Sequence, residues 1–268
     1  MRWMVARRGL AVVLAMLGVL LAKAAFAACM LGMVDQAPLL HRAAYLAEAA
    51  PANSVRITFL GHSTFLIETP EGASAVTDYN GLIAPPYVPD IVSMNNAHST
   101  HYTDSPDPAI RFVLRGWHPG GGLARNDVRW KDLHVFSIPT NIGEGGVRSN
   151  TSSIFVFEIS NLCIAHLGHL HHVLTPEQLQ TMGRIDILFV PIDGSSTMTH
   201  TEAIAVIEQI QPRLVIPMHF AFFGAADRFF ELARTRWPIR AEKGSTIVVR
   251  RDNLPKATEV RFLQGGMF

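Results

Sequence analysis

The stretch from Cys163 to His172 constrains this chain most, because an apolar strand pattern runs directly into a glycine and several histidines. Its sequence is CIAHLGHLHH, so that four imidazoles fall within seven residues. A strand that ends at a glycine turn is a common place for reacting groups in α/β folds, and neutral imidazole is a good ligand for zinc, iron or manganese. The stretch therefore favours a metal site. The alternative is a set of surface histidines, or of loop histidines held by hydrogen bonds.

Length, composition and charge restrict the kind of partner. The sequence has 268 residues, of which 49% are apolar, and its formal net charge is +1. This much apolar material is enough for a sizeable core. No run rich in lysine and arginine occurs beyond the N-terminus, so nothing in the charge predicts a nucleic-acid partner. We expect a small-molecule substrate.

Residues 1–28 have the pattern of a bacterial secretory signal peptide. Arg2, Arg7 and Arg8 precede an apolar segment over residues 9–22, and small residues follow over 24–28. The apolar segment is shorter than the roughly 20 residues that a membrane-spanning helix needs. We therefore expect a periplasmic or secreted protein, with an uncleaved membrane anchor as the alternative. The arginine pair suggests the twin-arginine export route.

The residues that follow bear on anchoring and on folding. Cys29 comes directly after the small residues and is a candidate for lipidation, which would make the protein a membrane-anchored lipoprotein. The other cysteine, Cys163, lies in an apparent core strand, where we expect a small buried side chain and no disulfide framework. Residues 29–54 are expected to lead into the domain, with a short amphipathic helix over residues 36–50.

Beyond residue 54 the pattern changes first to strands and then to strands that alternate with helices. Up to residue 159, strands are predicted over residues 55–60, 63–69, 73–78, 90–94, 133–138 and 151–159. In the last third, helices over residues 175–182, 200–209 and 226–234 alternate with strands over 185–190, 214–218 and 246–250. This order predicts a layered α/β domain over residues 55–268.

Several motifs resemble the metallo-β-lactamase superfamily in order and spacing, and within it the ascorbate-6-phosphate-lactonase-like hydrolases. They are GHSTFLIE from Gly61, the strand that ends at Asp78, the stretch from Asn96 to His101, the pair Leu167-Gly168, VPIDG from Val190 and IPMH from Ile216. The resemblance spans about residues 55–250. It implies a four-layer αβ/βα sandwich, in which metal binds at the edge that the two sheets share.

The chain departs from the family's first metal-binding motif, His-x-His-x-Asp-His. Asn96 replaces the first histidine and Thr100 replaces the aspartate, while His98 and His101 remain. Farther along, Asn141 stands where the family has its next histidine.

The resemblance places His169 where the family has a bridging aspartate, and His219 where it has its last histidine. Two divalent cations about 3.5–4 Å apart repel each other, and bridging anionic ligands offset this repulsion. Both family carboxylates are replaced here, so we expect one ion, bound by His101, His169 and His219, with His98 close by and His166 as a further candidate. Three histidines and one open position are typical of a hydrolytic zinc. Iron or manganese would fit the same ligands.

The remaining candidates are expected to support the ligands or to face the substrate. Asp78 resembles the family's buried carboxylate that orients a ligand histidine through its free ring nitrogen. Asn96 and Thr100 are also expected around the metal. His62 and His172 are candidate substrate contacts, as is His171, and a structural role in a turn is the alternative for His62. The histidines expected to be ordinary surface or loop residues are His41, His118, His134 and His200.

Three functional hypotheses follow. The leading one is an exported metal-dependent hydrolase, in which metal-bound hydroxide attacks an ester, lactone, amide or phosphodiester. The second is a member of the fold that has lost catalysis and binds a ligand, which Thr100 and His169 in place of carboxylates support. The third is a mononuclear oxidoreductase with iron or manganese, because histidine ligands alone do not select zinc.

Overall fold

The computed structural model describes residues 49–143, 148–220 and 226–264. The expected signal peptide over residues 1–28, the candidate lipidation site Cys29, His41 and most of the expected lead-in helix lie outside the described residues. The five described residues before the first strand, 49–53, are not helical. In the ranges that the structure describes, no helix is long and apolar enough to cross a membrane.

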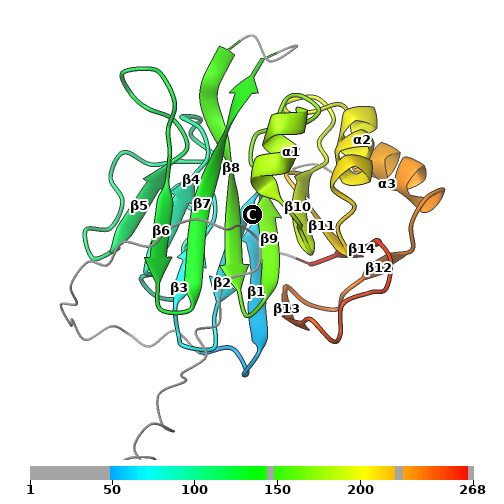
Figure 1. Ribbon diagram of the computed structural model, residues 1–268, viewed down its shortest axis with the longest axis horizontal. Coiled ribbons are helices and arrows are strands. Elements are labelled where there is room, and N and C mark those ends of the chain that lie inside the picture. The colour runs from blue at the N-terminus through cyan, green and yellow to red at the C-terminus, as the bar shows by residue number, and fades with distance from the viewer. Residues whose placement is uncertain (1–48, 144–147, 221–225, 265–268) are drawn as a thin grey trace, which may run out of the picture.

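The first sheet has six strands in the order β13-β1-β2-β3-β4-β5 (Figure 1). These strands are β1 (Ser54–Gly61), β2 (Thr64–Glu68), β3 (Ser74–Val76), β4 (Ile91–Met94), β5 (Phe112–Arg115) and β13 (Thr246–Arg250). β1 and β2 form an antiparallel hairpin, whereas β3, β4 and β5 run parallel to one another. The carboxyl ends of β3 and β4 therefore lie at the same edge of this sheet.

The second sheet has eight strands in the order β12-β14-β11-β10-β9-β8-β7-β6. These strands are β6 (Asp127–Trp130), β7 (Leu133–Ile142), β8 (Arg148–Ile159), β9 (Leu162–His166), β10 (Ile187–Pro191), β11 (Leu214–Met218), β12 (Ile239–Ala241) and β14 (Glu259–Phe262). β6 to β9 pair antiparallel, and β9, β10 and β11 pair parallel. The carboxyl ends of these three parallel strands also share an edge.

The two sheets pack face to face over one apolar core. Alternation along β1 turns Val55, Ile57 and Phe59 toward this core, where all three are buried. The ring of Phe65 in β2 stacks on that of Phe189 in β10, with 4.1 Å between centroids. Apolar contact between the sheets is the main force that holds them together, because it removes the largest side chains from water.

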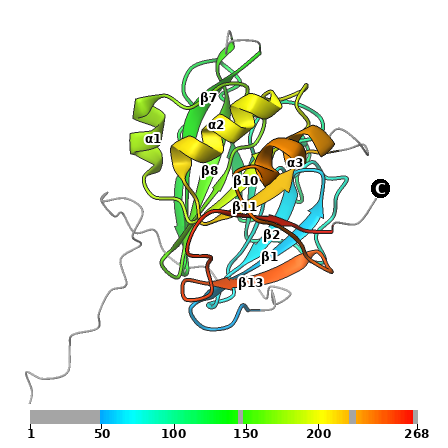
Figure 2. The same ribbon diagram turned by 90° about the vertical axis from the view of Figure 1, so that its right-hand side faces the viewer.

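Three helices cover the outer face of the eight-stranded sheet (Figure 2). They are α1 (Pro176–Met182), α2 (His200–Ile210) and α3 (Asp227–Arg234). A capping box, in which Thr199 and Glu202 exchange hydrogen bonds with each other's backbone, begins α2. Such a box satisfies amide groups that the first turn leaves unpaired. α2 buries Ala203, Ile204 and Val206 against the sheet.

Loop side chains cover the outer face of the six-stranded sheet in the described part of the chain. Tyr79, Tyr87, Tyr102 and Trp117 pack there against buried residues of β2, β3 and β4. The α/β sandwich with two sheets is thus confirmed. The three helices also lie where the sequence predicted them. The sequence analysis missed the short strands β5, β6, β12 and β14.

Cys163 is fully buried in β9, as expected, but it is disulfide-bonded. The expectation of no disulfide was therefore wrong on this point. It rested on burial among apolar neighbours, and burial does not distinguish a thiol from half of a disulfide.

Candidate metal centre

Several loops meet at one edge of the sandwich and bring histidines and carboxylates together. His62 lies in the turn between β1 and β2, Asp78 follows β3, and His101 comes from the loop after β4. In the other sheet, Asp193 follows β10 and His219 follows β11 directly. Because β3 and β4 are parallel, and β10 and β11 are parallel, the segments that follow each pair start at a common edge.

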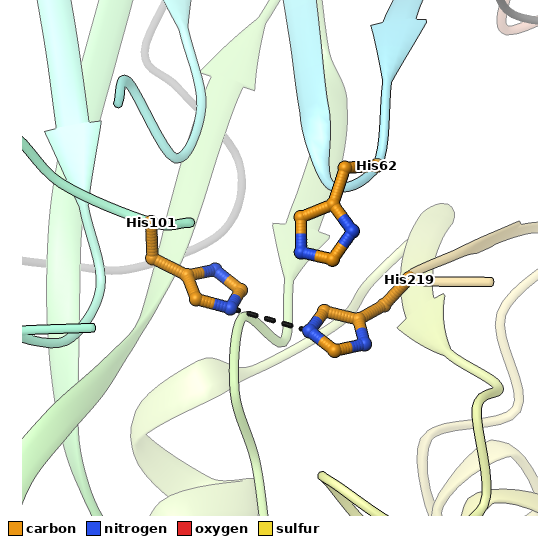
Figure 3. A group of neighbouring side chains, drawn as sticks. All are labelled: His62, His101 and His219. Carbon is orange, nitrogen blue, oxygen red and sulfur yellow. Dashed lines mark hydrogen bonds between the residues drawn. The ribbon is translucent and has the colours of Figure 1, made fainter. Parts of the chain in front are cut away.

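His62, His101 and His219 point toward one another, and each offers a ring nitrogen within 4.8 Å of the others (Figure 3). Nε2 of His101 is 3.3 Å from Nε2 of His219, and the rings of His62 and His219 have centroids 4.2 Å apart. His101 and His219 are buried, and His62 is partly buried. Nε2 of His62 is buried without a hydrogen-bond partner among the described residues. Converging imidazoles with an unpaired buried nitrogen fit a divalent metal ion.

Three residues of this edge have a left-handed backbone. The φ angles are +51° at His62, +46° at Asp78 and +58° at His219. A side chain other than glycine costs free energy in this region, and such strain persists only where the surrounding structure enforces it. One such contact is the amide of His219, which donates to the carbonyl oxygen of His62 at 2.8 Å. This bond joins the two sheets directly at the candidate metal centre.

Asp78 orients His101. Oδ2 of Asp78 lies 2.5 Å from Nδ1 of His101, and both side chains are fully buried. A proton on Nδ1 leaves Nε2 free to act as a ligand. Burial lowers the pKa of His101 well below its usual value, and the neighbouring His219 lowers this pKa further. Burial also raises the pKa of Asp78, so one proton between the two atoms satisfies both groups.

Asp193 orients His219 in the same way. Its Oδ1 lies 3.1 Å from Nδ1 of His219, so Nε2 of that ring faces His101. The backbone amides of Ser195, Ser196 and Thr197 all donate to Oδ2 of Asp193. Burial alone would raise the pKa of Asp193, but the hydrogen bonds from His219 and Thr197 outweigh burial and lower this pKa. Asp193 is therefore a carboxylate at neutral pH.

His169 lies beside the group of three. Its Nδ1 is 3.0 Å from Nε2 of His101, and the two rings meet edge to face. Burial, followed by the neighbouring His101, lowers the pKa of His169 to about 2. Burial, followed by His219, likewise lowers the pKa of His62 to about 3. These imidazoles are therefore neutral at physiological pH, which is the form that binds metal.

The comparisons with known proteins agree with this geometry. Residues 56–219 match the family model of the beta-lactamase superfamily domain, which is more than half of the chain. The chain belongs to the metallo-β-lactamase superfamily.

Two curated relatives belong to the UPF0173 group. A UPF0173 protein of Pyrococcus abyssi is 39% identical over 190 residues, which cover 63% of this chain and 85% of the relative. A UPF0173 metal-dependent hydrolase of Carboxydothermus hydrogenoformans is 26% identical over 192 residues, which cover 62% and 84%. Among solved structures, a metallo-β-lactamase superfamily member from Thermotoga maritima aligns with a TM-score of 0.57 and 24% identity, over 79% of this chain and 100% of that one. The resemblance to the ascorbate-6-phosphate-lactonase-like branch stays a prediction.

In this member of the superfamily, three of the predicted ligands lie outside the group of three, namely His98, His166 and His169. His98 is exposed, its Nδ1 lies 2.9 Å from Oγ1 of Thr100, and its ring stacks on that of His169. His166 is fully buried, but its Nε2 contacts the carbonyl oxygen of Ser63 at 2.8 Å and its Nδ1 accepts from an amide. Both nitrogens of His166 are used, so its candidacy as a ligand was wrong.

One of the two predicted substrate contacts also differs from expectation. His62, which we placed near the substrate, instead completes the group that can hold a metal. His172 is held by backbone, because its Nε2 accepts from the amide of Asn141 at 3.2 Å and its Nδ1 contacts the carbonyl oxygen of Val173 at 2.8 Å. Both of its ring nitrogens have backbone partners, and its contact with substrate stays a prediction.

The position that the superfamily's first metal occupies has few candidate ligands in this chain. Oδ1 of Asn96 accepts from the amide of His98 at 3.2 Å, and Oδ1 of Asn141 accepts from the amide of Asn150 at 3.0 Å. Both side-chain oxygens thus accept hydrogen bonds from backbone amides. Among the described residues, the triad of His62, His101 and His219 forms the single group that can hold an ion.

The expectation that His134 lies on the surface or in a loop was wrong, because its side chain is buried. It lies in β7, where its two ring nitrogens contact Glu158 of β8 at 2.6 Å and Asp127 of β6 at 2.8 Å. These partners come from cross-strand pairing, which the sequence does not show. His118 is exposed, as expected.

Asp193 is the functional residue that sequence reasoning missed. In the sequence, Asp193 was noted only as part of the VPIDG motif, and no role was predicted for it. The available signal was a carboxylate just after an apolar strand, which is the same signal that identified Asp78.

Proposed function

We propose that this chain is a metal-dependent hydrolase whose ion is held by His62, His101 and His219. The observation that carries the proposal is the convergence of three ring nitrogens, one of them buried and unpaired. The family membership supports it, as does the name metal-dependent hydrolase that relatives in the UPF0173 group carry.

A divalent ion in such a site supplies Lewis acidity and lowers the pKa of water. The residues of the chain prepare the site for this chemistry. Asp78 and Asp193 hold Nδ1 of His101 and His219, so that both rings present Nε2 without rearranging. His169 borders both this group and an adjacent cavity of about 440 Å³, where substrate would approach. The volume suits a small molecule with an ester, lactone, amide or phosphodiester bond.

We further propose one zinc ion per chain. Three neutral histidines and an open position are the usual donor set of hydrolytic zinc. The side-chain oxygens of Asn96 and Asn141 are occupied by backbone amides, so neither of these two residues supplies a ligand at the superfamily's other metal position. Iron or manganese would bind the same nitrogens, and elemental analysis distinguishes the three metals.

The place of action that we propose is the periplasm or the exterior of the cell. The support is the N-terminal pattern of arginines, apolar segment and small residues over 1–28. Lipidation at Cys29, which requires that this cysteine is not in a disulfide with Cys163, would add a membrane anchor to the same protein.

The experiment combines metal analysis with hydrolysis. Purified protein is stripped with a chelator, reloaded with zinc, and assayed on p-nitrophenyl acetate, a γ-lactone, bis-p-nitrophenyl phosphate and nitrocefin. We expect activity on at least one compound that disappears on stripping and returns with zinc. His219→Ala should lose it, and the control Arg129→Gln, at an exposed arginine of β6 that does not line the cavity, should keep it. Failure to bind any metal would refute the hydrolase and favour a non-catalytic ligand-binding protein.

A further inference from the structure

A cavity of about 440 Å³ opens beside the metal centre. One wall carries His98 and His169, and His169 lies against His101 of the triad. Trp117 forms another part of the wall, and its ring meets that of Tyr102 edge to face. The tips of β7 and β8 contribute Arg148 and its neighbours. A substrate in this cavity would therefore touch the metal centre at one end and other side chains at the other.

The ionisable side chains that line the cavity are all basic in the described part of the chain. Among the described residues that line it are one arginine and four histidines, and none is an aspartate or glutamate. The guanidinium of Arg148 keeps its charge at any physiological pH. The ion pairs of the described residues do not include Arg148. Among the described residues, Arg148 thus has no carboxylate partner at the wall of the cavity.

Arg148 and His171 both line the cavity, and the charge of Arg148 acts on His171. Burial lowers the pKa of His171, which also lines the cavity, and the charge of Arg148 lowers that pKa further. The acidic groups that act on His171 are Asp193 and Glu202. Both are engaged elsewhere, Asp193 with His219 and Glu202 with the cap of α2. Neither carboxylate neutralises Arg148.

We propose that Arg148 binds an anionic group of the substrate, a carboxylate or a phosphate, while the bond to be cleaved lies at the metal centre. Arginine presents a planar fork that matches both groups with two parallel hydrogen bonds. The wall that carries Trp117 would contact the apolar part of the same molecule. The substrate is thus a small anionic ester, lactone, amide or phosphodiester. The cleavage of this substrate rests on the proposed function. The binding of its anionic group by Arg148 does not depend on that function.

Binding is measured by calorimetry on zinc-loaded protein with two probes of the same shape, 3-phenylpropionate and the neutral 3-phenylpropionamide. The variants are Arg148→Gln, Arg148→Lys and, as the matched control, Arg129→Gln at an exposed arginine of β6. We expect wild type and the control to prefer the anion. Arg148→Gln should lose about tenfold in affinity for the anion, the loss of one charge-assisted hydrogen bond, with the amide unchanged. Arg148→Lys should retain part of the preference.

Anion binding by Arg148→Gln equal to wild type, or a wild type without preference for the anion, would overturn the proposal. Circular dichroism shows whether each variant is folded. We expect all variants to fold, because Arg148 is exposed. Hydrolysis of the p-nitrophenyl esters tests the reaction separately. Arg148-dependent binding without any zinc-dependent hydrolysis would refute the hydrolase and leave the anion site standing.

Discussion

Replacing His62 by glutamine tests whether this residue belongs to the metal centre. In the folded, metal-free protein, burial and the nearby His219 lower the pKa of His62 from 6.5 to about 3. In the unfolded chain the pKa returns to its usual value. Below pH 6.5 the unfolded chain therefore takes up a proton at this residue and the folded protein does not. The free energy of unfolding must then fall as the pH drops from 6.5 toward 3.

The size of the effect follows from proton linkage. At pH 5.5, one histidine with a pKa of 6.5 stabilises the unfolded chain by RT ln 11, about 1.4 kcal/mol, and at pH 7.5 by almost nothing. His62 is only partly buried, so we reduce this to about 1 kcal/mol for solvent screening. His62→Gln removes this proton uptake. Between pH 7.5 and 5.5, wild type should therefore lose about 1 kcal/mol more unfolding free energy than the variant.

The assay is urea unfolding of metal-free protein at both pH values, followed by tryptophan fluorescence. A zinc titration against a chromophoric chelator accompanies it. Because His62 would be a direct ligand, His62→Gln should weaken zinc binding by more than about 100-fold, the upper range for residues that only support a ligand. His118→Gln should bind zinc like wild type. The reasoning is refuted if His62→Gln keeps both the pH dependence and the zinc affinity of wild type.

Other predictions address the same edge of the sandwich and the N-terminus. Asp193→Asn should weaken zinc binding about 10- to 100-fold by releasing His219, as the same chelator titration would show. Gly168→Ala should lower the free energy of unfolding by more than about 1 kcal/mol, because φ is +58° and a Cβ would lie 1.1 Å from Nδ2 of Asn95; an unchanged urea midpoint would contradict this. Elemental analysis should find about one divalent ion per chain, and two would overturn the single-ion proposal. Cell fractionation should find the mature chain outside the cytoplasm, and an intact N-terminus on a cytosolic chain would exclude the signal peptide.

The sequence by itself determined much of the sandwich, because its signals are local. Alternation along residues 55–60 marks a strand with one buried face, and β1 forms there. The histidines and carboxylates after apolar strands were equally recognisable. Asp78, His101 and His219 therefore lie at the edge where the sequence analysis expected them.

Only the tertiary structure decided which histidines share the centre. His62 lies in a hairpin turn with no local sign of a metal, and it joins the group because the turn of one sheet meets the end of β11 in the other. His166 and His169 look alike in the sequence. Parallel pairing with β10 turns His166 onto the backbone of Ser63, and the turn at Gly168 directs His169 to His101. A sequence shows which residues stand at strand ends, but packing between sheets decides which ring nitrogens converge on one point, and only converging nitrogens can share a metal ion.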